Sequence, residues 1–169
     1  MQTKLISIEH IEAFIFDFDG VLTNDFVHVN QDGNESVSCH RSDGLAFDVL
    51  KKLNKPAFIL STETNSVVSK RASKLKIDSI QGVKDKALEL KKLAIENQYD
   101  LNRIFYVGND LNDYNAMKLC GYSACPSDSH KEIIAVSKIL LKKKGGTGVV
   151  RELLEDVLNI NFLKILYSE

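Results

Sequence analysis

Cysteine, long apolar runs and any excess of one charge are all scarce in this chain of 169 residues. The three cysteines (Cys39, Cys120 and Cys125) are odd in number and lack CxxC spacing, which indicates reduced thiols in a cytoplasmic protein. Lysine and arginine (22) nearly balance aspartate and glutamate (23), so charge gives no reason to expect a nucleic-acid partner. No apolar run approaches the roughly 20 residues of a membrane span, and we expect no membrane partner. Residues 1–10 lack the apolar core and cleavage site of a secretion signal.

Apolar runs and helix-type patterns alternate along the chain. Three segments are apolar at every position, which is typical of strands buried on both faces of a parallel sheet. They are Ala13–Phe16, Ala57–Leu60 and Ile104–Val107, with weaker candidates at Ile77–Ile80, Tyr122–Ala124 and Ile139–Leu141. The alternation predicts an α/β fold with a mainly parallel sheet and helices on both sides. No repeat, low-complexity segment or linker interrupts the pattern, so we expect residues 1–169 to form a single domain.

A β-hairpin is expected after the first strand, over about residues 25–39. Asp32-Gly33 is a good turn signal, and it lies between the β-type runs Phe26–Val29 and Ser36–Cys39. These runs mix apolar and polar residues, so the hairpin would be marginal alone and should pack on something. Ser42 or Asp43 is then expected to cap the helix that follows.

Two aspartates, Asp17 and Asp19, stand where the first strand should end. Gly20 follows them and lets the chain turn sharply beside whatever the carboxylates bind. Ligands of open α/β sheets collect at the C-terminal ends of the strands, and a carboxylate pair there needs a cation or a proton. The stretch therefore predicts a hard-metal site with one carboxylate free to react, although taken alone it could be a solvated Asp-rich turn.

Polar side chains follow three other expected strands as well. Ser61 ends the second strand, Lys86 lies just after the third, and Asp110 and Asp113 end the fourth. Singly, Ser61 is more often a helix N-cap and Lys86 a solvated helix residue. Strands of a parallel sheet point the same way, however, so these groups should converge on one crevice. A hydroxyl, an ammonium and carboxylates around a divalent metal are the groups that phosphoryl transfer needs.

These residues resemble the four motifs of the haloacid dehalogenase superfamily of phosphatases, from about Ala13 to about Val157. The matching motifs are Asp17–Thr23, Ser61, Lys86 and Gly108–Asp113. The resemblance implies a Rossmann-like three-layer sandwich in which Asp17 attacks phosphorus and becomes an aspartyl-phosphate. Asp19 would then protonate the leaving alcohol and later deprotonate the attacking water.

The same resemblance implies a Mg²⁺ ion and a phosphate site. Mg²⁺ would be held by the Asp17 carboxylate, the Asp19 backbone carbonyl and Asp110. Many relatives begin the fourth motif with Gly-Asp-Asp, whereas Asn109 brings no charge, so the metal contact falls to Asp110. Asp113 and Asn109 would act behind the metal ligands. The residues implied to bind the phosphate are Ser61, Thr62, Lys86 and Gly20.

No cap domain fits into this chain: the hairpin and one helix fill the interval before the second strand and Ser61, and a helix and a short strand fill the interval from Ser61 to Lys86. An open crevice does not exclude water, so something else must cover it. A neighbouring subunit is the simplest candidate. The resemblance narrows here to capless sugar-acid phosphatases, which form tetramers around such hairpins. Segments Arg41–Gly44 and Gly145–Leu153 also look like theirs. We therefore expect a homotetramer acting on a small sugar-acid phosphate.

The residues after Ser61 bear on the substrate. Octulosonate 8-phosphate phosphatases typically read Thr-Gly-Arg here, whereas this chain reads Ser61-Thr62-Glu63. Glu63, with Arg71 and Lys74 downstream, resembles the nonulosonate 9-phosphate phosphatases of sialic acid biosynthesis. Glu63 would accept hydrogen bonds from substrate hydroxyls, and Arg71 or Lys74, one of them from an adjacent subunit, would pair with the substrate carboxylate. Alternatively, Glu63 only favours a helix N-terminus and both cations are solvated.

Three rival functions stay open at this point. The first is 3-deoxy-D-manno-octulosonate 8-phosphate phosphatase, which is disfavoured because Glu63 stands where those enzymes typically have Arg. The second is a non-catalytic oligomerisation module related to the C-terminal domains of cytidylyltransferases, which is disfavoured because all four motifs are intact. The third is a receiver-like domain that merely accepts phosphate on Asp17, which would have no need of Asp19 as acid and base.

Overall fold

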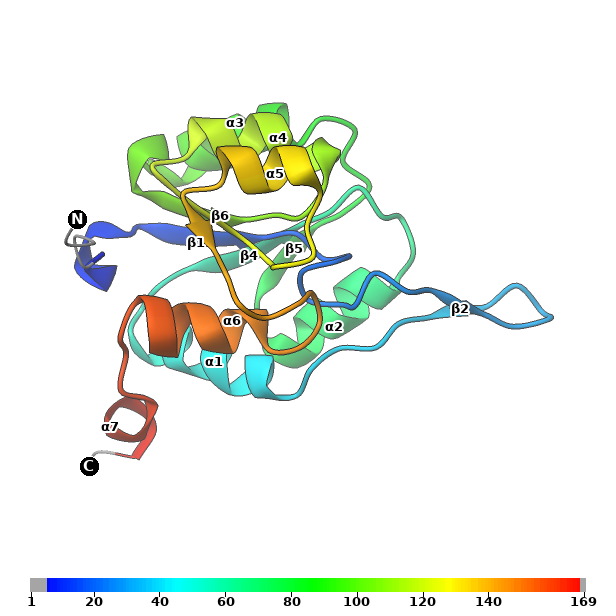
Figure 1. Ribbon diagram of the computed structural model, residues 1–169, viewed down its shortest axis with the longest axis horizontal. Helices are drawn as coiled ribbons and strands as arrows, with labels where there is room; N and C mark the ends of the chain where they lie inside the picture. Colours follow the sequence, from blue (N-terminus) through cyan, green and yellow to red (C-terminus); the bar gives the residue numbers. More distant parts are fainter. Residues whose placement is uncertain (1–5, 168–169) are drawn as a thin grey trace.

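The computed structural model describes residues 6–167, and its centre is a six-stranded sheet between two layers of helices (Figure 1). The strands are β1 (Ala13–Phe16), β4 (Ala57–Leu60), β5 (Asp78–Ile80), β6 (Ile104–Val107), β7 (Tyr122–Cys125) and β8 (Ile139–Leu140). Their order across the sheet is β5-β4-β1-β6-β7-β8, and every neighbouring pair is parallel. The expected parallel sheet is thus confirmed.

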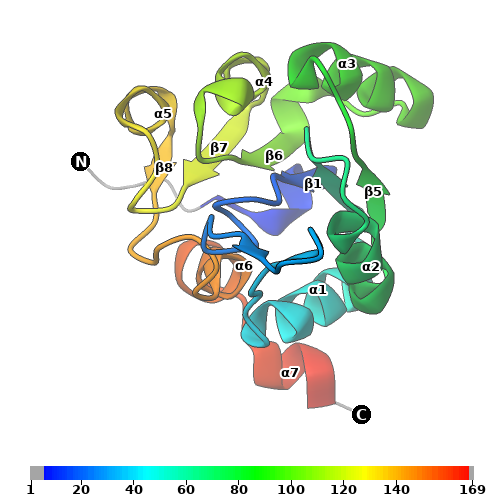
Figure 2. The same cartoon turned by 90° about the vertical axis from the view of Figure 1, so that its right-hand side faces the viewer.

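Helices cover both faces of this sheet (Figure 2). One layer contains α3 (Lys86–Asn97), α4 (Tyr114–Leu119) and α5 (Lys131–Val136). The other contains α1 (Ser42–Lys52), α2 (Val67–Leu75) and α6 (Val149–Glu152), which continues as a π-helical turn over Leu153–Val157. Helix α7 (Phe162–Tyr167) packs on the outside of α1. None of the helices in the described part of the chain is long and apolar enough to cross a membrane.

The central strand β1 is buried on both faces because its side chains alternate between the two helical layers. Phe14 and Phe16 enter the core shared with α1, α2 and α6. Ala13 and Ile15 enter the core shared with α3 and α4. Burial on both sides explains why every position of this strand is apolar, and it fixes where the chain after Phe16 emerges.

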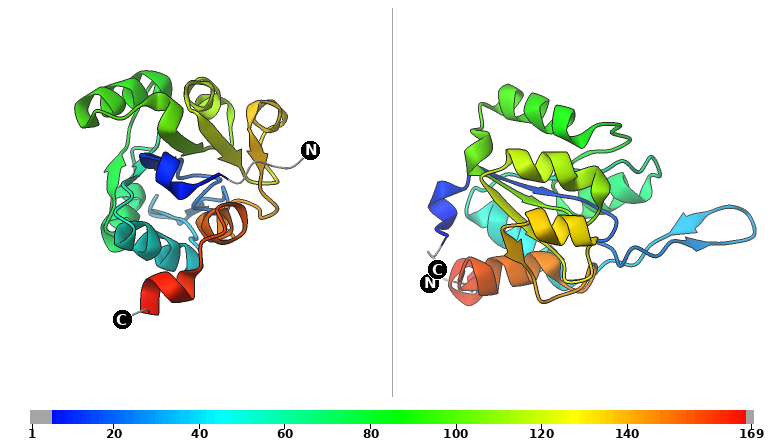
Figure 3. Two further views of the ribbon diagram at one scale, coloured as in Figure 1. Left: turned by 90° about the vertical axis from the view of Figure 1, so that its left-hand side faces the viewer. Right: turned by 45° about the horizontal axis from the view of Figure 1, so that its top comes forward.

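The predicted hairpin forms, but with shorter strands than expected. Strands β2 (His28–Val29) and β3 (Glu35–Ser36) pair antiparallel, and the arm projects away from the sheet (Figure 3). Most of residues 24–38 are exposed, so the arm has little to pack on within this chain. An isolated two-stranded ribbon gains little by lengthening its ladder, which accounts for the short strands.

The expectation that Ser42 or Asp43 caps α1 is wrong. The position before α1 is Arg41, which makes no side-chain cap, and Ser42 Oγ instead lies 2.6 Å from His40 Nδ1. Asp43 turns inward and accepts hydrogen bonds from the backbone N–H groups of Val150 and Arg151, at the start of α6. Those N–H groups lie at a buried helix N-terminus, where a carboxylate is more stabilising than at an exposed one.

A close backbone contact beneath β7 gives a test of this packing. A Cβ atom placed on Gly121 would lie 1.7 Å from the backbone oxygen of Asn102. Gly121→Ala should therefore lower the free energy of unfolding by about 1–3 kcal/mol, measured by urea denaturation. Gly44→Ala is the matched control, because Gly44 lies in α1 with no atom closer than 4.0 Å to such a Cβ. The control should be neutral or more stable by up to about 1 kcal/mol, and equal losses in both variants would contradict the packing described.

Candidate active site

The chain segments that follow β1, β4 and β6 come together at the edge of the sheet from which the hairpin emerges (Figure 2). Asp17 follows β1, Ser61 follows β4, and Asp110 lies after β6. Lys86 is the first residue of α3, whose N-cap is Asp85. Because all these strands run parallel, their C-terminal ends bring residues far apart in sequence to one place.

The Lys86 ammonium lies between two buried carboxylates. Its Nζ is 2.7 Å from Asp17 Oδ1 and 2.8 Å from Asp113 Oδ1. Lys86 is 2% exposed and Asp17 is 4% exposed, so water screens this cluster very little. Burial alone would lower the pKa of Lys86, but Asp17 and Asp113 outweigh it and raise that pKa. The lysine is therefore a fixed cation.

Asp17 carries the opposite perturbation. Its pKa is raised well above the ordinary value, first by burial and then by the neighbouring Asp113 carboxylate, against the pull of Lys86. With all three groups ionised, one ammonium and two carboxylates give the cluster a net negative charge. A further cation beside Asp17 would offset the penalty of burying its charge.

Asp113 is hydrogen-bonded through both oxygens. Oδ1 accepts from the Tyr106 hydroxyl at 2.8 Å as well as from Lys86, and Oδ2 accepts from the N–H groups of Asn109 (2.9 Å) and Asp110 (3.3 Å). A Cβ on Gly108 would lie 2.5 Å from Asp113 Cγ, so only glycine allows this approach. Asp113 therefore holds Lys86 and the loop after β6 in one arrangement. Sequence reasoning missed Tyr106, whose only signal was a hydroxyl in an otherwise apolar strand.

Asp19 lies on a tight turn beside this cluster. The Thr23 hydroxyl donates to Asp19 Oδ1 at 3.4 Å and accepts from the N–H of Gly20 at 3.2 Å. Gly20 has φ +73°, and a Cβ there would lie 1.8 Å from Asn109 Nδ2. The pKa of Asp19 is raised by burial, then by the charge of Glu63. Glu63 is thus near enough to Asp19 for its charge to act on that carboxyl.

The loop after β4 carries Ser61, Thr62 and Glu63. Ser61 is buried, and its Oγ accepts the N–H of Glu63 at 3.1 Å. Thr62 Oγ1 accepts from Asn112 Nδ2 at 3.3 Å, which joins this loop to the one after β6. Glu63 Oε1 accepts the N–H groups of Thr64 (2.6 Å) and Asn65 (2.7 Å), so one of its oxygens is occupied by its own loop.

Arg71 and Lys74 lie apart from this group in the described chain. Arg71 Nη2 donates to the His40 carbonyl at 3.1 Å, at the base of the hairpin, and Lys74 is exposed on α2. Among the described residues, no hydrogen bond or ion pair joins either cation to Asp17, Asp19 or Glu63. The structure therefore shows, in its described part, no direct bond between these cations and the carboxylates of the candidate site in the same subunit.

Further carboxylates interact near this site. The pKa of Asp25 is raised by burial and then by the charges of Asp110 and Asp128. Hard oxygen donors are what Mg²⁺ prefers, and a cation would relieve this repulsion. Within residues 6–167, however, no three Asp, Glu, His or Cys side chains lie close enough to hold a metal by themselves. A metal here would need donors of another kind as well, such as a backbone carbonyl, an amide oxygen or water. The expected set of Asp17, Asp110 and the carbonyl of Asp19 stays a prediction.

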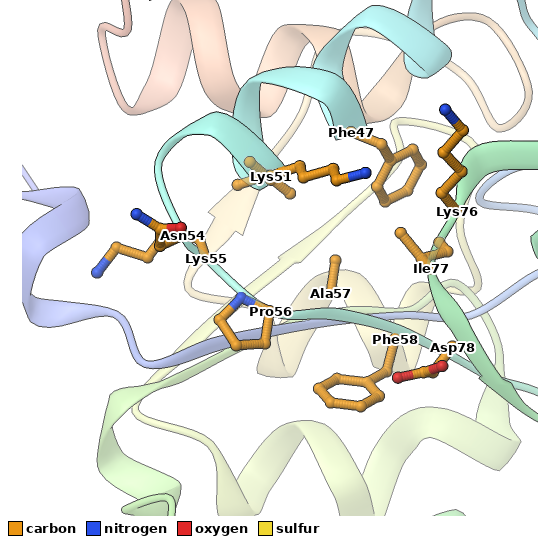
Figure 4. Close-up of a pocket in the computed structure, with 11 residues that line it drawn as sticks. Phe47, Lys51, Asn54, Lys55, Pro56, Ala57, Phe58, Lys76, Ile77 and Asp78 are labelled. Carbon is orange, nitrogen blue, oxygen red and sulfur yellow. The ribbon is translucent and has the colours of Figure 1, made fainter.

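A hollow of about 380 Å³ opens at the opposite edge of the sheet, between the C-terminal turns of α1 and α2 (Figure 4). Phe47, Ala57 and Ile77 form its apolar wall, and Lys51 and Lys76 lie at its rim. None of the candidate residues lines it. The candidate site is thus marked by its buried charges and not by a deep pocket.

Comparison with known proteins agrees with this geometry. A family model described as haloacid dehalogenase-like hydrolase matches residues 48–153, well over half of the chain. The structure of a HAD family hydrolase from Streptomyces avermitilis is 38% identical, covering 94% of this chain and 91% of that chain with a TM-score of 0.90.

Two further relatives have named substrates or activities. A 3-deoxy-D-manno-octulosonate 8-phosphate phosphatase from Moraxella catarrhalis, solved with magnesium ion, phosphate ion and KDO, is 31% identical. That match covers 90% of this chain and 88% of the other, with a TM-score of 0.86. The N-acylneuraminate cytidylyltransferase A of Danio rerio is 24% identical over 152 residues, which are 89% of this chain but 35% of that protein. The chain therefore belongs to the haloacid dehalogenase-like hydrolase family, among relatives that include phosphatases, as its four motifs predict.

Proposed function

We propose that this protein is a Mg²⁺-dependent phosphatase that hydrolyses a sugar-acid phosphomonoester through an aspartyl-phosphate. The observation that carries the proposal is the Lys86 ammonium fixed between Asp17 and Asp113 at the C-terminal edge of the sheet. A non-catalytic module would have no need of a buried cation and two carboxylates, because such a cluster costs stability unless every member is paired. The intact cluster therefore favours an enzyme over an oligomerisation module.

The reaction follows from the positions of two aspartates. An Asp17 oxygen attacks phosphorus, the bond from phosphorus to the substrate oxygen breaks, and Asp19 gives its proton to the departing alkoxide. Asp19 then takes a proton from water as that water attacks the aspartyl-phosphate, which releases inorganic phosphate and regenerates Asp17. Burial and Glu63 raise the pKa of Asp19, which favours the protonated form needed in the first step. Lys86 and the Ser61 hydroxyl bind phosphoryl oxygens, with help from Thr62 and the backbone at Gly20.

The residues present fit a Mg²⁺ ion. Asp17 and Asp110 would hold it together with the backbone carbonyl of Asp19, and Asn109 and Asp113 would support those ligands. Asn109 Oδ1 is buried without a hydrogen-bond partner, as an acceptor reserved for a bound group would be. When bound, Mg²⁺ neutralises charge on the transferring phosphoryl group and on the carboxylates around it.

Two sugar acids are candidate substrates. The position of Glu63 beside Asp19 favours a nonulosonate 9-phosphate, because its free oxygen can accept hydrogen bonds from hydroxyls close to the scissile bond. The similarity to the Moraxella phosphatase favours 3-deoxy-D-manno-octulosonate 8-phosphate instead. We propose that Arg71 or Lys74 pairs with the carboxylate of either substrate, with one of these cations coming from an adjacent subunit.

We further propose that the protein is a homotetramer held together through the hairpin. Phe26 is 70% exposed and Val29 is 64% exposed, on an arm with little support inside the chain. Exposed apolar residues on a projecting arm are typical of subunit interfaces. The hairpin of a neighbouring subunit lying over the active site would shield it from water, as a cap domain does in other phosphatases of this kind.

Asp17→Asn tests the reaction itself. The amide oxygen can still accept from Lys86, so the variant should fold, but an amide cannot form the acyl phosphate. Phosphate release from sugar-acid phosphates should need Mg²⁺ in the wild type and vanish in Asp17→Asn. Asp156→Asn, an exposed change elsewhere, should keep full activity. Normal turnover by purified Asp17→Asn would remove the covalent mechanism from consideration.

Glu63→Gln tests the substrate assignment. The glutamine oxygen keeps the bonds from Thr64 and Asn65, while its amino group can no longer accept from a substrate hydroxyl. We expect kcat/KM for a nine-carbon sugar-acid phosphate to fall by roughly 10–200-fold, with little change on para-nitrophenyl phosphate. Equal losses on both esters would mean that Glu63 supports the phosphoryl site. A wild-type preference for the eight-carbon ester would decide for the octulosonate.

Replacing Phe26 and Val29 together by serine tests the assembly. The double variant should run at a smaller mass in light scattering and lose activity on the sugar-acid phosphate, because the interface and the cover are lost together. Leu163→Ser is the matched control, since Leu163 is 74% exposed on α7, away from the hairpin. A wild-type mass of one subunit at micromolar concentration would refute the tetramer.

A further inference from the structure

Residues 141–148, here called the tail loop, lie directly against the turn that carries Asp19. The N–H of Gly146 donates to the carbonyl of Val21 at 3.0 Å. A Cβ on Gly145 would lie 2.2 Å from the Gly20 oxygen, and one on Gly146 would lie 2.4 Å from the Asn24 nitrogen. The contact is therefore backbone against backbone, and a shift of the tail loop must move the turn.

The tail loop is itself fixed by two buried carboxylates. Glu152 accepts the N–H groups of Lys142 (2.7 Å) and Lys143 (2.9 Å) at the start of the loop. Asp43 Oδ1 accepts the N–H groups of Val150 (3.1 Å) and Arg151 (3.2 Å) just past its end. Asp43 is almost wholly buried, and its second oxygen, Oδ2, has no hydrogen-bond partner. The carboxylate thus holds the helix through a single oxygen.

Gly148 joins the anchor to the loop. It has φ +98°, and a Cβ there would lie 2.9 Å from Ser42 Oγ, next to Asp43 in α1. The start of α6 is consequently pressed onto the start of α1, and Asp43 is the side chain that bonds the two together. Release of Asp43 would free α6 to move with the tail loop.

We propose that Asp43 is a positioning residue for the reaction: by holding the start of α6, it sets the tail loop against the Asp19 turn and so fixes the direction of the Asp19 carboxylate. This inference rests on the proposed phosphatase function. The connection runs from Asp43 through the tail loop to Val21, and within the turn Thr23 donates to Asp19. A proton donor displaced by about 1 Å can lose on the order of 10²-fold in rate.

Leaving-group dependence separates this role from a merely structural one. An alkyl alkoxide needs a proton from Asp19 as it departs, whereas para-nitrophenolate leaves without one. Asp19 also acts as base on the aspartyl-phosphate, a step common to both esters, so the first step is measured by itself as alcohol or phenol release in a single turnover. Asp43→Ala should lower that rate on a 3-deoxy sugar-acid phosphate by roughly 10–100-fold, and on para-nitrophenyl phosphate by less than about threefold. Asp19→Asn should show the same pattern in the first step, with a larger loss on the sugar-acid phosphate.

Conservative variants provide the rescue and the controls. Asp43→Asn should restore most of the rate, because its amide oxygen accepts the same two N–H groups and Oδ2 has no bond to lose. Asp100→Ala removes a side-chain cap at the other edge of the sheet and should leave both rates unchanged at a temperature well below its Tm. Should Asp43→Ala fail to fold, Asp43→Ser, whose hydroxyl accepts one of the two N–H groups, should show the same selective loss at a smaller size.

The outcomes separate the two proposals. A wild type that hydrolyses neither ester would refute the proposed function, whatever the Asp43 variants do. A wild type that hydrolyses both, with equal losses on the two esters in the Asp43 variants, would overturn the positioning role. So would an Asp43→Asn variant as impaired as Asp43→Ala.

Discussion

The Lys86 ammonium between Asp17 and Asp113 is the interaction on which the rest of the site depends. It joins the end of β1, the start of α3 and the loop after β6. Removing one member of a buried ion cluster typically costs about 3–5 kcal/mol, because the remaining charges stay unpaired. The position of Lys86 also runs against the helix dipole, which disfavours a cation at an N-terminus. The two carboxylates outweigh that dipole, so the cluster and not helix stability determines the residue at the first position of α3.

The same cluster explains why the surrounding backbone is so constrained. Asp113 can reach Lys86 only because Gly108 leaves room for it, and its second oxygen then fixes the N–H groups of Asn109 and Asp110. The Asn109 side chain lies so close to Gly20 that a Cβ atom at position 20 would overlap it. A chain of close contacts therefore leads from one buried ammonium to the turn that carries Asp19. The contacts that hold the reactive groups at this edge of the sheet are thus the same contacts that fix the backbone around them.

The sequence predicted the fold well where burial alone determines it. The strands Ala13–Phe16, Ala57–Leu60 and Ile104–Val107 appear with the expected bounds because an apolar run has few other places to go. Asp43 was misjudged because a cap signal is local, whereas its partners Val150 and Arg151 are over a hundred residues away. Tyr106 was missed because its hydroxyl bond to Asp113 depends on the β6–α4 loop folding back over the strand. The family and its motifs could be predicted from the sequence. The hydrogen-bond partners of the buried side chains could not, because they lie far apart along the chain.

The structure separates the chemistry of the site from its choice of substrate. Asp17, Lys86 and Asp113 are buried and bonded to one another, so removing one of them disturbs the packing as well. Glu63 has one oxygen bonded within its own loop, Arg71 is bonded to the carbonyl of His40, and Lys74 is exposed on α2. Substitutions at these outer positions leave the Lys86 cluster untouched. Substrate preference can therefore change through such outer positions while the buried residues stay the same.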